Sequence, residues 1–154
     1  MSKPTGQVIA ENATWLSIVT QLFGTRMVTL LKPHGLTLGQ FGILHHVTQV
    51  PVNKSQRVSD IAAAVEVGQP AVTKALHKFQ TMGLVRLDDD LADRRATLVF
   101  TLPEATALLG RIQQSIYPDL SDVFASLAAE DAQELARLLK ALGQWLDQNR
   151  LKPS

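Results

Sequence analysis

Apolar residues recur at steps of three and four positions along most of the chain, a spacing typical of amphipathic helices. The pattern predicts a long first helix over residues 7–32, which ends before Pro33. Two more long helices are predicted over residues 103–127 and 130–148. Pro118 is expected to kink the first of these, because a proline inside a helix removes one hydrogen bond. The apolar stripes are wide, so we expect these helices to pack on other helices, in part from a second subunit.

A further helix is predicted after Thr37. Thr37 is followed three residues later by Gln40, which gives a capping box at the start of this helix. Apolar residues from Phe41 to Val47 continue the helical spacing, and Pro51 lies beyond the end. This helix is expected to pack against the buried side of the next two helices.

Two shorter helices joined by a tight turn are predicted in the middle of the chain. Ser59 is a residue type able to cap the first of them, which runs over residues 58–65. Gly68 provides a permissive backbone for the turn, Pro70 suits the first turn of the second helix, and Gly83 ends that helix. Two helices joined in this way form a helix-turn-helix, whose second helix can lie in the major groove of DNA.

The second of these helices starts near Gln69 and presents small and polar side chains opposite its apolar stripe. Such side chains hydrogen-bond to base edges or phosphates, and alanine can contact a thymine methyl group. The predicted DNA-binding residues of this helix are Gln69, Pro70, Ala71, Thr73, Lys74, His77 and Lys78. We assign Lys78, Ser59 and Thr37 to phosphates, and the others except Pro70 to base edges. The alternative is an ordinary solvent-exposed helix face.

After this helix the periodicity changes from helical to alternating, which predicts a β-hairpin. One strand starts at Leu84, the other at Ala96, and the charged segment DDDLADRR forms the tip. A hairpin in this position is the wing of a winged helix. Arg94 and Arg95 are candidates to enter a minor groove or to contact phosphates, with Asp93 orienting one guanidinium through a bidentate pair. The alternative is that both arginines only form salt bridges with the nearby aspartates.

Three segments resemble the MarR family of bacterial transcription regulators: LTLGQFGILHHV, VSDIAAAVEVGQPAVTKALHKFQTMGLV and DRRATLVFT. The resemblance extends over nearly the whole chain, and its most specific parts are the G-L-V after the recognition helix and the D-R-R-A before the second wing strand. It implies a mainly α (α+β) fold in one domain over residues 1–154. The winged helix-turn-helix would cover residues 36–101, and the dimerisation helices residues 7–32 and 103–148. It further implies a homodimer that binds a pseudo-palindromic operator in double-stranded DNA and usually represses transcription.

Three features depart from the family's pattern. The first wing strand carries Leu87 and Asp88 where members often have a basic residue, so we expect the wing to bind DNA more weakly. The loop over residues 50–57 is longer than usual, which shifts the expected phosphate contacts of its basic residues. The usual segment after the wing is replaced by one in which Thr101 and Glu104 offer a capping box for the next helix.

The resemblance also implies a small-molecule effector. Family members often bind small phenolic or carboxylate effectors between their first, second and fifth helices, so Arg26 and His45 become candidate anion contacts. The alternative is that both are plain surface residues. His45 and His46 are adjacent, about 100° apart on a helix, a spacing that seldom places two ligands on one metal ion. We therefore expect no metal site, and no cofactor.

The composition excludes several classes of function. The chain has 154 residues, of which 45% are hydrophobic, and this suits a soluble globular domain. Because we find neither a signal peptide nor a long apolar run, we expect a cytoplasmic protein. The absence of cysteine excludes disulfides and cysteine-based redox switches. No glycine-rich phosphate loop, G-x-S-x-G or H-E-x-x-H motif is present, so we expect no enzyme activity.

The net charge of +1 does not by itself indicate nucleic-acid binding. Residues 53–101 contain seven lysines and arginines against six aspartates and glutamates. Affinity for DNA must then come from the placement of these side chains, and a dimer would double the number of contacts. The near balance leaves a second hypothesis open, a winged-helix protein-interaction module that does not read DNA.

Overall fold

A computed structural model describes residues 3–151 and divides the chain into two compact units, Met1–Gln113 and Gln114–Ser154. The first unit contains the helix-turn-helix and the wing, and the second contains the end of α5 and the last helix. The elements in chain order are α1 (Gly6–Leu31), η1 (Lys32–His34), α2 (Leu38–Val47), β1 (Ser55–Arg57), α3 (Val58–Val65), α4 (Gln69–Thr81), β2 (Val85–Asp89), β3 (Thr97–Thr101), α5 (Pro103–Phe124) and α6 (Ala129–Gln148). The mainly helical fold class and the winged helix predicted from the sequence are confirmed.

The first helix, α1, ends close to the predicted position. Thr5 caps its start with a side-chain oxygen that accepts from the Val8 backbone N–H, and a short 3₁₀ turn follows Leu31. Gly35 then adopts φ 68°, a left-handed conformation that glycine takes without steric cost. Most apolar side chains of α1 are exposed; Leu22, for example, is 66% exposed.

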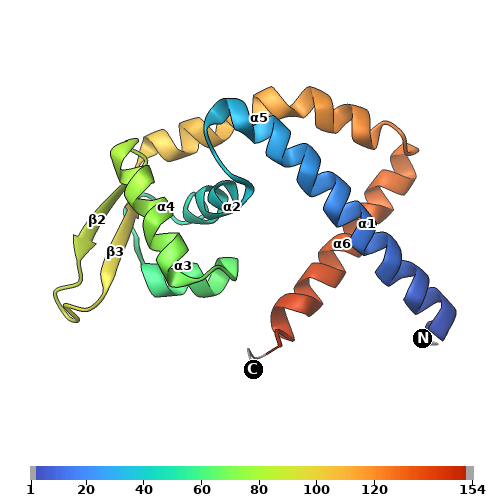
Figure 1. The fold of residues 1–154 in the computed structure, drawn as a ribbon, viewed down its shortest axis with the longest axis horizontal. Helices are drawn as coiled ribbons and strands as arrows, with labels where there is room; N and C mark the ends of the chain where they lie inside the picture. The colour runs from blue at the N-terminus through green and yellow to red at the C-terminus, as the bar shows by residue number, and fades with distance from the viewer. Residues whose placement is uncertain (1–2, 152–154) are drawn as a thin grey trace. The chain divides into compact units, whose positions relative to one another are not determined.

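The second helix, α2, begins with the predicted capping box. The Thr37 side chain accepts from the Gln40 backbone N–H at 3.1 Å, and the Gln40 side chain accepts from the Thr37 backbone N–H at 3.2 Å. Leu44 and Val47 of this helix are fully buried. The helix therefore supports α3 and α4, as the sequence predicts, and Figure 1 shows it beside them.

The core of the first unit lies between α2, α3 and α4. Ile61 of α3 and Leu76 and Phe79 of α4 are fully buried, and burial of each such side chain contributes about 2 kcal/mol to folding. This apolar contact buries one face of α4. The opposite face is left to solvent.

Two predicted details of the helix-turn-helix are wrong. Ser59 does not cap α3, because the helix begins at Val58, with Arg57 in the capping position and no side-chain cap. The left-handed residue of the turn is Glu66, at φ 53°, whereas Gly68 has φ −55° and needs no special freedom. The turn is nevertheless where the sequence places it, and Pro70 lies in the first turn of α4.

The end of α4 is a Schellman motif. Gly83 has φ 72°, its backbone N–H donates to the Gln80 carbonyl, and the Leu84 N–H donates to the Phe79 carbonyl. Leu84 and Phe79 are both buried, so a hydrophobic contact accompanies the motif. The predicted role of Gly83 is confirmed.

The wing is the predicted hairpin, extended by a strand that the sequence analysis assigned to a loop. Strands β2 and β3 pair antiparallel from Val85 opposite Thr101 to Asp89 opposite Thr97, and β1 pairs with the other edge of β3. Figure 1 shows the hairpin projecting beside α3 and α4. Strand β1 has three residues, Ser-Gln-Arg, which show no apolar alternation, so periodicity cannot detect it.

The capping box predicted at Thr101 does not form. Thr101 is the last residue of β3, is 1% exposed, and donates its hydroxyl to the Val47 carbonyl at 2.8 Å. Glu104 instead accepts from Arg111 at 2.6 Å. The hydroxyl of Thr101 therefore joins the wing to α2, and because α5 begins at Pro103, Thr101 is not in the capping position directly before the helix.

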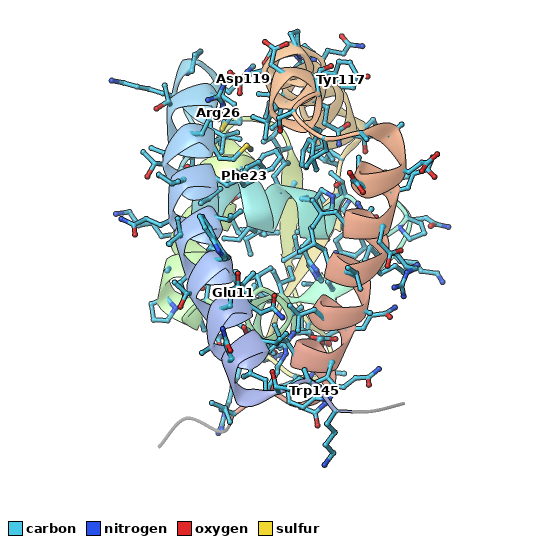
Figure 2. The ribbon with its side chains drawn as sticks, turned by 90° about the vertical axis from the view of Figure 1, so that its right-hand side faces the viewer. Glu11, Phe23, Arg26, Tyr117, Asp119 and Trp145 are labelled. Carbon is cyan, nitrogen blue, oxygen red and sulfur yellow. The ribbon has the colours of Figure 1, made fainter. Side chains whose placement is uncertain are left out.

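In α5, Pro118 lies inside the helix, and the kink that it predicts stays a prediction. The helix ends at Phe124, before the expected residue 127. Helix α6 matches its predicted bounds within one residue and buries none of its side chains; Trp145, labelled in Figure 2, is 59% exposed. Among the described residues, no helix is long and apolar enough to cross a membrane.

Candidate nucleic-acid interface

The exposed face of α4 carries the residues that the sequence assigns to DNA. Gln69, Pro70, Ala71, Lys74 and His77 are exposed, and Thr73 is half-buried. They lie on the side of α4 opposite the buried core residues, so the predicted division of the helix into two faces is confirmed. Their contacts with DNA stay a prediction.

A groove of about 470 Å³ lies between this face and the wing. Five of the predicted DNA-binding residues line it, from three separate segments of the chain: Ser59, Gln69, Thr73, His77 and Arg95. The structure thus brings together residues up to 36 positions apart in the sequence, from Ser59 to Arg95. Gln80, Asp88 and Asp89 line the same groove and had no predicted role at the site, while Arg57, a basic residue of the 50–57 loop, and Asp93, expected to orient an arginine, line it as well.

Arg57 is the main addition to the site. Its Nη2 lies 2.6 Å from Asp90 Oδ2, and its Nη1 lies 4.0 Å from Asp93 Oδ2. The other oxygen of Asp90 accepts the Ala92 backbone N–H at 2.9 Å. The Ala92 N–H and then the Arg57 guanidinium lower the pKa of Asp90, because both stabilise its carboxylate form. Sequence analysis missed this role because it placed Arg57 in a loop, far from the wing tip in sequence.

Arg94 and Arg95 are exposed in the turn at the tip of the wing. The bidentate pair expected between one of them and Asp93 does not form. Asp93 accepts the Arg95 backbone N–H at 3.1 Å and lies nearest the guanidinium of Arg57. Within residues 3–151, neither Arg94 nor Arg95 has an ion-pair partner, so both guanidinium groups are available to phosphates or bases.

The base of the wing carries a further arginine that is already engaged. Arg86 forms an ion pair with Asp88 at 3.0 Å, and its guanidinium carbon lies 4.4 Å from the centre of the Phe100 ring. The first wing strand therefore offers little free positive charge. The expectation that the wing binds DNA more weakly than in related proteins stays a prediction.

The three predicted phosphate contacts lie in different settings. Thr37 is exposed at the start of α2, and Ser59 is exposed in the first turn of α3. Lys78 is half-buried and donates to the Gly35 carbonyl at 2.5 Å and to Gln40 Oε1 at 3.0 Å. Its ammonium group thus donates two hydrogen bonds within the protein, whereas the sequence analysis expected this side chain to be exposed and to contact phosphate.

The candidate effector contacts are both exposed. Arg26 lies on α1, where Figure 2 labels it, and His45 lies on α2. Neither residue lines the groove beside α4, so their effector role stays a prediction. In the described part of the chain, no group of three or more histidines, aspartates and glutamates is arranged to hold a metal ion.

Comparison with known proteins gives the same fold. Residues 34–96 match the model of the MarR family. BldR, a transcriptional regulator from Sulfolobus solfataricus, has a TM-score of 0.72 at 21% identity, with 97% of this chain and 100% of that chain covered. A cysteine-to-serine variant of MarR from E. coli, solved in complex with operator DNA, has a TM-score of 0.68 at 20% identity, with 91% and 99% covered.

A third solved structure concerns BpsR from Bordetella bronchiseptica and the regulation of its DNA binding by 6-hydroxynicotinic acid. It has a TM-score of 0.65 at 20% identity, with 84% of this chain and 98% of that chain covered. At these identities the structural likeness establishes the fold. Together with the family match, it confirms the resemblance stated from the sequence.

Proposed function

We propose that this chain, whose residues 34–96 match the model of the MarR family, is a DNA-binding transcriptional regulator that acts as a dimeric repressor. One observation carries the proposal. The polar face of α4 and Arg95 of the wing tip line the same groove, and Arg94 is exposed next to Arg95 in the turn, so one protomer offers a helix for a major groove and a basic tip for the backbone or minor groove beside it.

The dimer is supported by the exposed apolar side chains of the long helices. On α1, Trp15, Val19 and Leu22 are all more than half exposed, and on α6 so are Trp145 and Leu146. Such extensive apolar surface marks an interaction site, and a second copy of the chain would cover it with the same surface. Two recognition helices must then lie roughly 34 Å apart to enter successive major grooves.

A small-molecule effector would release the operator by changing the separation of the two recognition helices. The regulation described for BpsR supports this part of the proposal. A small phenolic or carboxylate compound is the expected class, with Arg26 and His45 as its anion contacts. No catalytic step is proposed, since the related structures are those of transcriptional regulators.

The positions of the charged side chains in the winged helix matter more for DNA binding than the net charge does. Asp90 and Asp93 lie close to Arg57, and Asp88 pairs with Arg86. These pairs neutralise several carboxylates of the wing within the protein, so the remaining positive charge at Arg94, Arg95 and Lys74 faces DNA with less competition. Net charge alone would underestimate the affinity.

The test is a titration of the purified protein into labelled duplex covering the region upstream of its own gene, at increasing salt, with an unrelated duplex of equal length beside it. A regulator binds the first duplex selectively, and its affinity falls steeply with salt as counterions are released. A protein-interaction module with the same fold binds neither duplex. That second outcome would refute the proposed function.

A further inference from the structure

Two lysines on α4 differ sharply in their surroundings. Lys74 is exposed and has no hydrogen bond or ion pair within residues 3–151. Lys78 lies one helical turn further on, is half-buried, and donates two hydrogen bonds from its ammonium group. The two lysines of α4 therefore differ in what their ammonium groups contact: that of Lys78 bonds to the protein, and that of Lys74 does not.

Both acceptors of Lys78 lie within residues 35–40, which end the 3₁₀ turn and begin α2. One is the carbonyl oxygen of Gly35, the left-handed residue that ends the 3₁₀ turn after α1. The other is the side-chain oxygen of Gln40, at 3.0 Å. Lys78 is 43 and 38 residues away from these two partners in the sequence, so the bonds connect separate elements of the fold.

Gln40 is itself fixed. Its side-chain oxygen also accepts the Thr37 backbone N–H at 3.2 Å, and its own backbone N–H donates to Thr37 Oγ1 at 3.1 Å. The ammonium group therefore attaches α4 to a closed capping box rather than to a mobile side chain. Hydrogen bonds from a charged donor are roughly twice as strong as neutral ones, so this attachment resists rotation of α4 about its own axis.

We propose that Lys78 is a positioning residue, in place of the phosphate contact expected from the sequence. It fixes the orientation of α4 against the start of α2 through Gln40 and Gly35, and so determines which bases Gln69, Thr73 and Lys74 reach. This inference rests on the proposed DNA-binding function. It assigns Gln40 and Gly35, neither of which faces the groove, a part in sequence selectivity.

The first test measures Lys78→Met on the upstream duplex and the unrelated duplex over a range of salt, with Arg137→Ala on α6 as a control for the loss of one positive charge outside the candidate interface. For Lys78→Met we expect selective affinity to fall about tenfold, with binding to the unrelated duplex and the salt slope both unchanged. A phosphate contact would instead weaken both duplexes and lower the slope by about 0.9 for each protomer. That result would overturn the proposal.

A second test uses Gln40→Met alone and combined with Lys78→Met. If Lys78 acts through Gln40, the double variant loses no more selectivity than Lys78→Met alone, whereas independent roles give losses that add. Additive losses would contradict the proposal.

The third measurement does not require DNA. Hydrogen exchange of the segment 36–42 in the free protein should be faster in Lys78→Met and unchanged in Lys74→Met, because only Lys78 is bonded to this segment. Unchanged exchange in both variants would show that Lys78 does not anchor α4, even if the protein binds DNA. Absence of selective binding by the unmodified protein would refute the proposed function, and the exchange result would still decide whether Lys78 joins α4 to α2.

Discussion

The guanidinium of Arg57, at the end of β1, lies 2.6 Å from the carboxylate of Asp90, just past the end of β2. Thirty-three residues separate the two in sequence. Asp90 is 8% exposed and holds the start of the wing tip through the Ala92 backbone N–H, so the ion pair links the tip to the start of α3. We therefore expect the stability of the wing to depend on this pair.

Replacing Asp90 tests this dependence. Asp90→Asn removes the carboxylate that accepts from Arg57 and Ala92, and we expect a lower melting temperature at neutral pH. The pKa of Asp90 is lowered in the folded protein, so its stabilising effect is fully present above its unfolded value of about 3.9 and is lost as pH falls through the folded value. The difference in melting temperature between the two proteins should therefore shrink as the pH is lowered from neutral through the lowered pKa of Asp90.

Asp89→Asn is the matched control for this experiment. Asp89 is exposed at the end of β2 and has no ion pair among the described residues, so its replacement should leave the melting temperature nearly unchanged at every pH. Equal losses from the two replacements would mean that the total negative charge of the wing, rather than the contact of Asp90 with Arg57, stabilises it.

Arg94 and Arg95 should contribute to DNA binding through their charge. We expect Arg94→Ala to weaken binding to all duplexes and to lower the salt slope by about 0.9 for each protomer if it contacts one phosphate. Arg95→Ala should act in the same direction, because its guanidinium group likewise has no ion-pair partner within residues 3–151. Fluorescence anisotropy at several salt concentrations measures both.

Arg137→Ala on α6 provides a control with the same loss of charge. Arg137 is paired with Glu134 at 2.6 Å, and we expect its replacement to leave the salt slope unchanged. If Arg94→Ala behaves like Arg137→Ala, the wing tip does not contact DNA.

Lys74 is expected to read a base edge. Lys74→Ala should cost about 1–3 kcal/mol of discrimination at one operator position and leave the preference at other positions intact. The measurement is a set of duplexes that differ from the selected sequence by one base pair each. A uniform loss over the whole set would assign Lys74 to a phosphate instead.

Sequence patterns predict the helices of this protein well because each helix repeats its apolar spacing many times. The three-residue strand β1 has no such repetition, and its partner is the distant β3. Likewise, the pattern identifies the exposed face of α4 but not the difference between Lys74 and Lys78. That difference depends on where Gly35 and Gln40 lie, which is a long-range property of the fold.

Capping motifs also show that a local sequence pattern does not always predict the structure that forms. The capping box of Thr37 and Gln40 forms as predicted, and Gln40 Oε1 accepts a tertiary hydrogen bond from Lys78 without losing the bond from Thr37. The matching pattern at Thr101 and Glu104 fails, because Thr101 ends β3 and donates its hydroxyl to the Val47 carbonyl, while α5 begins only at Pro103. A local motif therefore fails where the tertiary structure places its first residue in another element.

The Thr101 hydroxyl should stabilise the junction of the wing and α2. Thr101→Val keeps the shape but removes the donor to the Val47 carbonyl, which still accepts the Val50 N–H at 3.3 Å. We expect a loss of about 1 kcal/mol, or about 3 °C in melting temperature. Thr101→Ser, which keeps the hydroxyl, should retain more of the hydrogen-bond contribution, and the half-buried Thr97→Val at the other end of β3 serves as the control. A larger loss in Thr101→Ser than in Thr101→Val would show that the methyl group matters more than the hydrogen bond.

The exposed apolar side chains of α1 should form the interface between two copies of the chain. Leu22 is 66% exposed, and Leu22→Glu places a charge on this surface that a second copy would have to bury. We expect the unmodified protein to sediment as a dimer and the variant to shift toward monomer, with a loss of selective DNA affinity because one protomer contacts only one half-site. Glu11→Lys changes the charge of an exposed polar residue on the same helix and should preserve the dimer. A monomeric unmodified protein, or a Leu22→Glu variant that remains fully dimeric, would remove α1 from the interface.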